Sequence, residues 1–145
     1  MSRFPEGQEN FIPAQTAKEF SGQMLEKGYA LDFSLNSLKN EIDKIIESPD
    51  IKLDGADPDA WRIQYSLEAY IGHTLALLFN GVWKGEFCKD NPGVNFYTSY
   101  VEFGKYLYYP SHFIGYRISN GPKEGLFKDY LERVLPKIKE RIENS

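Results

Sequence analysis

The pattern of hydrophobic positions predicts one long buried helix at the centre of the chain, from Asp57 to Phe79. Apolar or small residues cover more than one side of this helix, which is typical of an element in the middle of a domain. Asp57 and Pro58 favour initiation, since an aspartate N-cap and a proline in the first turn both suit a helix start. Asn80 and Gly81 supply a left-handed stop. The small residues that should let a neighbouring element approach closely are Ala69, Gly72 and Ala76.

Two further helices are expected before the central one. A helical pattern begins at Pro13 and ends at Gly28, and an extended link then leads to Ser34, which should cap the next helix. Residues 1–12 are expected to form an irregular arm, and residues 49–57 a loop. The apolar stripe of the helix after Ser34 is narrow, so we expect this helix to lie on the outside. Its stripe is Leu35, Leu38, Ile42, Ile45 and Ile46, and the positions expected to face water are Lys39, Glu41, Asp43, Lys44 and Glu47.

After the central helix, the hydrophobic pattern changes to that of strands. Three strands are expected, at Val82–Phe87, Asn95–Phe103 and Lys105–Tyr109, and the short turns between them predict an antiparallel meander. One face of this sheet should lie on the central helix. The other face should be partly covered or should remain as an aromatic surface.

The rest of the chain predicts helical structure. Residues 110–119 fit either a short helix or a fourth strand, and a helix is favoured because Asn120 and Gly121 resemble a helix stop. A final helix runs from Leu126 to Ile142, and Pro136 should kink it or divide it in two. The sequence therefore predicts an α+β fold in a single domain, residues 1–145. N-terminal helices come first, then the buried helix, a meander of about three strands and a C-terminal helix.

Composition narrows the classes of function. Hydrophobic residues at 41% are sufficient for a core in a chain of 145 residues. The net charge of −4 gives no electrostatic support for binding to nucleic acid or to an anionic membrane. The single cysteine, Cys88, excludes an intramolecular disulfide and fits a reducing compartment. No run resembles a signal peptide or a membrane span. These features predict a soluble, cytoplasmic protein.

Three stretches resemble a group of small bacterial α+β domains of uncharacterised function. They are "LDFSLNSLKNEIDKII", "AYIGHTLALLFNGVW" and "YYPSHFIGYRISNG", and the resemblance covers roughly residues 31–121. The chain departs from the group at His73, where the group often carries an acidic residue. The resemblance implies the α+β fold and brings no activity with it.

Few residues have the spacing of a catalytic or metal site. His73 would need an orienting acid to act as a general base, and Glu68 lies five positions earlier, about 500° around the helix, so the two do not share a face. A structural histidine is the favoured interpretation. Cys88 lacks a neighbouring Cys–His motif, and the adjacent pair Ser111 and His112 lacks a nucleophile elbow.

Metal and phosphate motifs are absent as well. The acidic stretch from Asp50 to Asp59 fails the count of a calcium loop, because Lys52 and Trp61 occupy two of the required ligand positions. Neither zinc spacing nor a phosphate-binding glycine motif occurs. We therefore expect no catalytic residue, no metal and no cofactor.

The aromatic content of the strands is the most unusual feature of the sequence. Tyrosine combines a large rigid area with a polar tip, which suits interfaces. The leading hypothesis is a non-enzymatic module that uses the sheet or the acidic segment 41–59 to bind a protein partner, such as an immunity-like protein that blocks a cationic toxin. The alternative is a small-molecule-binding domain or small hydrolase, whose pocket between the central helix and the sheet would contain His73, Tyr100 and Cys88. Homodimerisation through the sheet edges is a third possibility. The candidate binding residues are His73, Trp83, Tyr97, Tyr100, Tyr106, Tyr108 and Arg117.

Overall fold

The computed structural model describes residues 12–48, 58–85, 99–110, 114 and 126–143. It confirms the α+β class and the C-terminal helix. The described helices are α1 (Ile12–Glu26), α2 (Leu35–Asn40), α3 (Ile42–Glu47), α4 (Pro58–Phe79) and α7 (Phe127–Glu143), and the strands are β1 (Val82–Lys84), β2 (Tyr100–Phe103) and β3 (Tyr106–Tyr108).

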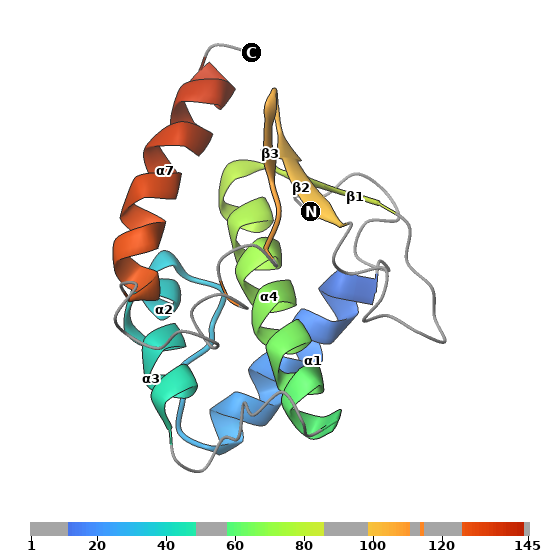
Figure 1. Cartoon of the computed structure of the whole chain (residues 1–145), viewed down its shortest axis with the longest axis vertical. Coiled ribbons are helices and arrows are strands. Elements are labelled where there is room, and N and C mark those ends of the chain that lie inside the picture. The colour runs from blue at the N-terminus through green and yellow to red at the C-terminus, as the bar shows by residue number, and fades with distance from the viewer. Residues whose placement is uncertain (1–11, 49–57, 86–98, 111–113, 115–125, 144–145) are drawn as a thin grey trace.

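Helix α4 is the central element, as its all-round apolar pattern predicts. Every residue from Ser66 to Ala76 is buried, so the middle of the helix has no wet side. Its most extensive contact is with α1, and the sheet and α2 also pack on it. Figure 1 shows α4 in the middle of the fold, with α7 standing beside the β2–β3 hairpin. None of the helices in the described residues is both long and apolar enough to cross a bilayer.

The three strands form the expected antiparallel meander in the order β1-β2-β3. Val101 pairs with Trp83 on one side and with Tyr108 on the other, and Phe103 pairs with Tyr106. Because side chains alternate along a strand, these five residues share one face of the sheet. That inner face packs toward α4 and α7, and four of the five side chains are buried; Tyr106 is half-buried.

Two glycines allow the sheet to lie close against α4. A Cβ atom added to Gly72 would come within 2.5 Å of the Trp83 ring, and one added to Gly81 would come equally close to Val101 and Phe103. Asn80 takes the left-handed conformation that ends the helix, with φ of 56°. The Gly81 amide then donates a hydrogen bond of 2.9 Å to the carbonyl of Ala76, which completes the stop.

The prediction of a single helix after Ser34 is wrong in one respect, because the segment forms two short helices, α2 and α3. Ser34 caps α2 as predicted, and its side chain accepts a hydrogen bond from the Ser37 amide. At Glu41 the backbone departs from helical geometry, with φ of −105°, and α3 begins at the next residue. Glu41 is bonded to both helices, because its amide donates to the Ser37 carbonyl of α2 and its carbonyl accepts from the Ile45 amide of α3.

The expectation that Asp43 faces water is also wrong. Its side chain is buried, and its carboxylate accepts hydrogen bonds from the backbone amides of Phe127, at 2.8 Å, and Lys128, at 3.1 Å. The amides of a helix's first turn have no partner within the helix, so a carboxylate from another helix can satisfy them. Asp43 therefore joins α3 to the start of α7.

Pro136 does not divide the C-terminal helix. Helix α7 continues through it from Phe127 to Glu143. The proline is exposed, whereas Leu135 and Ile138 on either side of it are buried against the core. Packing on both sides of Pro136 offsets the loss of one backbone hydrogen bond.

Several sequence predictions concern residues outside the described ranges. They include the arm at residues 1–12 except for Ile12, which begins α1, the loop at 49–57 with the proposed cap Asp57, and the ends of the first two strands toward residues 86–98. Most of the ambiguous segment 110–119 also lies there, although Pro110 and Ile114 are described and buried. Of the candidate residues, Tyr97, Cys88, Ser111, His112 and Arg117 fall outside the described part.

Candidate functional site

The outer face of the sheet presents aromatic and apolar side chains that the core does not absorb. Tyr100 and Tyr109 are half-buried, and their ring centroids lie 5.1 Å apart in a tilted arrangement. Leu107 is 44% exposed. It lies on the same face as Tyr109, because side chains alternate along the strand. We call this surface the outer sheet face and define it by Val82, Lys84, Tyr100, Glu102, Leu107 and Tyr109.

Charged side chains flank the tyrosine pair. Lys84 pairs across the strands with Tyr100, and Glu102 pairs with Leu107. The face thus combines an apolar centre with one group of each charge, the arrangement that protein interfaces commonly show. A contiguous apolar patch at the surface of a small domain often marks a contact site.

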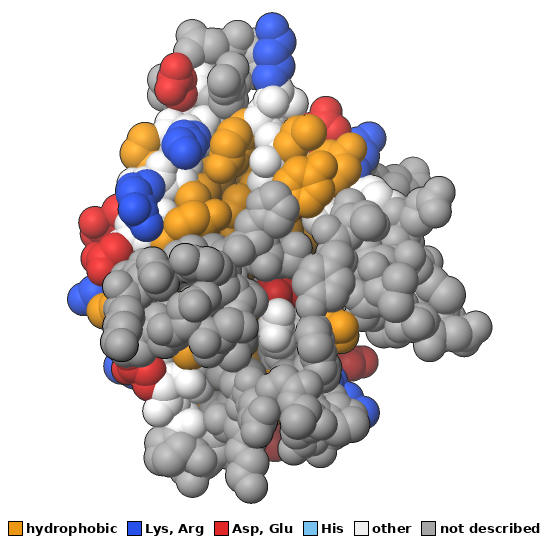
Figure 2. All heavy atoms as spheres, in the orientation of Figure 1, with side chains coloured by type: hydrophobic (Ala, Val, Ile, Leu, Met, Phe, Trp, Pro, Cys, Tyr) orange, Lys and Arg blue, Asp and Glu red, His pale blue; other side chains and the backbone are white. Residues whose placement is uncertain are grey.

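A second aromatic group lies where the sheet meets α7. The hydroxyl groups of Tyr106 on β3 and Tyr130 on α7 both raise the pKa of Tyr108 on β3, and Tyr106 also raises the pKa of Tyr130. Burial is the main cause in each case: it raises the pKa of Tyr130 to about 12 and that of Tyr108 well above its usual value. Figure 2 shows hydrophobic side chains gathered at the top of this view, between α7 and the β2–β3 hairpin. We call Tyr106, Tyr108 and Tyr130 the tyrosine cluster.

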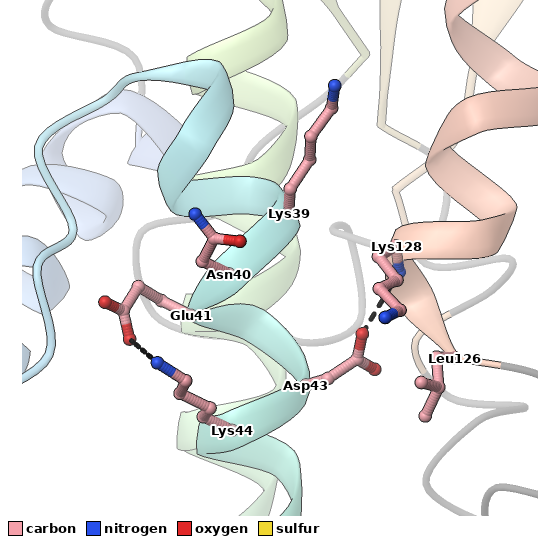
Figure 3. A pocket seen from close by; sticks show the side chains of 7 residues that line it. All are labelled: Lys39, Asn40, Glu41, Asp43, Lys44, Leu126 and Lys128. Carbon is pink, nitrogen blue, oxygen red and sulfur yellow. Dashed lines mark hydrogen bonds and ion pairs between the residues drawn. The ribbon is translucent and has the colours of Figure 1, made fainter.

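A groove of about 460 Å³ lies between the α2–α3 pair and the start of α7 (Figure 3). Asp43 points from α3 toward the first turn of α7, and Lys44 points toward Glu41. The Lys44 ammonium lies 3.9 Å from the Glu41 carboxylate. The groove is lined by Lys39, Asn40, Glu41, Asp43, Lys44, Leu126 and Lys128.

Both carboxylates of the groove already have structural partners. Asp43 accepts hydrogen bonds from two backbone amides of α7, and Glu41 forms an ion pair with Lys44. The Lys44 side chain is exposed, so solvent screens this pair, and it contributes under about 1 kcal/mol. The groove is therefore explained best as part of the packing interface between α3 and α7.

His73 lies in the core. It is 2% exposed, and its ring meets the edge of Phe33 at a centroid distance of 5.7 Å. Burial is the main reason that the pKa of His73 falls to about 4, with a smaller contribution from the charge of Lys18. A neutral imidazole enclosed in this way matches the structural role favoured from the sequence.

Phe33 itself is held by α4. It has a left-handed backbone, with φ of 61°, which is uncommon for a residue with a bulky side chain. Its amide donates a hydrogen bond of 2.9 Å to the Tyr70 hydroxyl, which also bonds the Ser37 hydroxyl at 2.6 Å. His73 and Tyr70 thus fix the turn that leads into α2.

Glu68 is the most unusual buried group. It is fully buried, Gln64 Nε2 donates to its Oε1 at 3.1 Å, and Oε2 has no hydrogen-bond partner among the described residues. Burial raises the pKa of Glu68 to about 8, and the Gln64 hydrogen bond lowers it by less. Glu68 therefore holds a proton at neutral pH.

The structure does not gather the described candidate binding residues into one site. Tyr100 lies on the outer sheet face, whereas Trp83, Tyr106 and Tyr108 share the inner face. His73, Trp83 and Tyr108 are each buried, so a partner could not reach them without rearrangement.

The helix–sheet pocket of the alternative hypothesis has little room where the structure describes it. At Gly72 the Trp83 and Pro110 side chains lie so close that an added methyl group would clash. Tyr100 points to the other face of the sheet, away from His73. Within the described residues, no group of three or more histidine, cysteine, aspartate or glutamate side chains could hold a metal ion.

Comparison with known proteins found no matching family model, curated protein or solved structure. The resemblance to small bacterial α+β domains therefore stays a prediction.

Sequence reasoning missed Asp43 and the burial of Glu68. Asp43 stands on the polar side of a short helix, and its partners lie 84 and 85 positions later, so no local pattern reveals the contact. Glu68 could have been suspected, because it stands between Leu67 and Ala69 in a helix that is apolar all round.

Proposed function

We propose that the protein is a non-enzymatic interaction module that binds another protein through the outer sheet face. The observation that supports this most is the tilted ring pair of Tyr100 and Tyr109 beside the exposed Leu107. Aromatic anchors with little conformational freedom contribute strongly to protein interfaces. The buried position of His73 favours this function over the small hydrolase.

The net charge of −4 favours a partner with a basic surface. An immunity-like role, in which this chain covers a cationic toxin, fits that charge and the tyrosine content. Such a complex would form faster at low salt, because long-range attraction is screened as ionic strength rises. We place this binding in the cytoplasm of a bacterial cell, in line with the single cysteine and with the resemblance.

The test is site-specific photo-crosslinking in cells of the source organism. A photoreactive residue is placed at position 107 or, as a matched control, at position 25. Leu25 is 64% exposed on α1 and is the other large apolar side chain exposed in the described part of the chain. It lies near the end of α1, far from the hairpin (Figure 1).

The expected result is one discrete adduct with a second protein from position 107 and none from position 25. The adduct must then be reproduced with the purified partner at a fixed stoichiometry in size-exclusion chromatography. Equal labelling from both positions would contradict the proposal. An adduct of twice the chain's mass would show that the outer sheet face binds a second copy of this chain, which would contradict binding to a different protein.

A further inference from the structure

Glu68 lies on the side of α4 that the sheet covers. When ionised, its carboxylate raises the pKa of Tyr108 on β3, so the two groups lie near each other, and Tyr108 is itself buried. One turn later on the same helix, Gly72 touches the Trp83 ring of β1. The carboxyl group is thus enclosed at the α4–sheet interface.

Among the described residues, no positive charge is found to act on Glu68 or Tyr108. Gln64 of α4 is neutral, and the tyrosine cluster supplies hydroxyl groups from β3 and α7. Arg133 of α7 acts on Tyr130, at the outer end of that cluster. On the α1 side of α4, Lys18 acts on His73.

An ionised carboxylate in this position would leave Oε2 charged and without a hydrogen bond from the described residues. A buried charge without a partner is costly, and the structure can relieve the cost by admitting water. We expect the sheet to be the element that moves, because its strands are only three or four residues long and short strands carry few contacts. Helix α1, in contrast, packs along α4 over a far larger contact.

We propose that Glu68 is a proton-operated lock, which keeps the sheet closed on α4 while its carboxyl group is protonated and releases it when the group ionises. The ligand of this site is the proton, and the moving part is the sheet together with the tyrosine cluster. This inference is independent of the proposed partner binding.

The direction of the pH dependence follows from linkage. The pKa of Glu68 is about 8 in the closed state and near its ordinary value of 4.5 once water reaches it. The open state then gains population as pH rises between those two values and levels off above pH 8. From pH 6.5 to 7.5 the opening equilibrium constant should rise about tenfold. His73 stays neutral over that interval as long as it is buried, since its pKa then lies at about 4.

Hydrogen exchange measured by mass spectrometry tests the lock on the full chain. After correction for the pH dependence of chemical exchange, peptides that cover β1–β3 should show the tenfold rise in opening between pH 6.5 and 7.5. In Glu68→Gln, which keeps the oxygen that Gln64 bonds, the rise should be less than twofold. Glu102→Gln, a half-buried glutamate on the outer sheet face, is the matched control and should keep the wild-type slope.

A flat wild-type profile, or the same slope in Glu68→Gln, would overturn the proposal. A second measurement needs no variant: the ¹³Cδ resonance of Glu68 should titrate with a midpoint near pH 8. A midpoint near the ordinary glutamate value would show that the group is ionised at neutral pH, and the lock would be excluded.

Discussion

The carboxylate of Asp43 on α3 lies 2.8 Å from the backbone nitrogen of Phe127, the first residue of α7. It also accepts a bond from the next amide, so one side chain satisfies two of the free donors at that helix start. The C-terminal helix is thereby tied to an element more than eighty positions earlier.

Asp43→Ala should lower the free energy of unfolding by about 1–3 kcal/mol, because two amides lose their acceptor in a place that water reaches poorly. Urea denaturation gives the value. Asp129→Ala is the matched control: Asp129 is an exposed acid in the first turn of the same helix, and it should cost under about 1 kcal/mol. Equal losses in the two variants would show that the Asp43 contact adds nothing beyond helix-dipole compensation.

Gly72→Ala should destabilise the protein by about 1–3 kcal/mol, although alanine is the better helix former. The added methyl group would lie 2.5 Å from the Trp83 ring and 2.9 Å from Pro110. Gly22→Ala in α1 is the control, since nothing lies within 4 Å of its added Cβ. It should stabilise by about 0.5–1 kcal/mol. Thermal unfolding of both variants measures these changes in stability. A gain in stability for Gly72→Ala would show that the sheet lies farther from α4 than the structure has it.

Tyr70→Phe should lower the free energy of unfolding by about 1–3 kcal/mol. The variant keeps the ring beside Phe33 but removes the acceptor of the Phe33 amide and the partner of Ser37. Tyr100→Phe, on the outer sheet face, is the control and should change stability by less than about 0.5 kcal/mol. Chemical denaturation curves that coincide for the two variants would argue against the turn being held by Tyr70.

Glu68 and His73 should shape the stability profile in opposite directions. The raised pKa of Glu68, about 8, makes stability fall as pH rises from 4.5 to 8. The lowered pKa of His73, about 4, makes stability fall as pH drops from 6.5 toward 4. In wild-type protein the two effects should nearly cancel between pH 4.5 and 6.5, and stability should decline above that interval.

Glu68→Gln separates the two effects. Its stability should be flat from pH 6.5 to 8 and should fall by about 1.4 kcal/mol per pH unit as pH drops from 6.5 toward 4, because His73 is the described group whose shifted pKa then acts in that range. Denaturant midpoints at half-unit pH steps measure this profile. A variant whose stability still declined above pH 6.5 would assign that decline to another group.

The fold followed from the sequence where the pattern is long and local. The apolar sides of α4, the close approach expected at Gly72 and the Asn80–Gly81 stop each depend on near neighbours, and each is confirmed. The meander was predictable for the same reason, since alternation and short turns set its order.

The sequence predictions that were wrong concern features that depend on distant residues. Asp43 stands among lysines and glutamates that face water, and only the position of α7 makes it a cap. The break at Glu41 lies inside an otherwise continuous apolar stripe. Among the candidate residues, alternation places Tyr100 on one face of the sheet and Tyr106 and Tyr108 on the other, but the sequence does not show which face meets α4 and α7.

The most direct test of the central claim is the affinity of the purified partner for Leu107→Lys and for Leu25→Lys, measured by calorimetry against the wild-type chain. Both substitutions place a lysine at an exposed leucine, so they should disturb folding equally little. Docking on the outer sheet face predicts that Leu107→Lys weakens binding at least tenfold, while Leu25→Lys stays within twofold of wild type. Equal affinities for the two variants would contradict the account and place the partner on another surface.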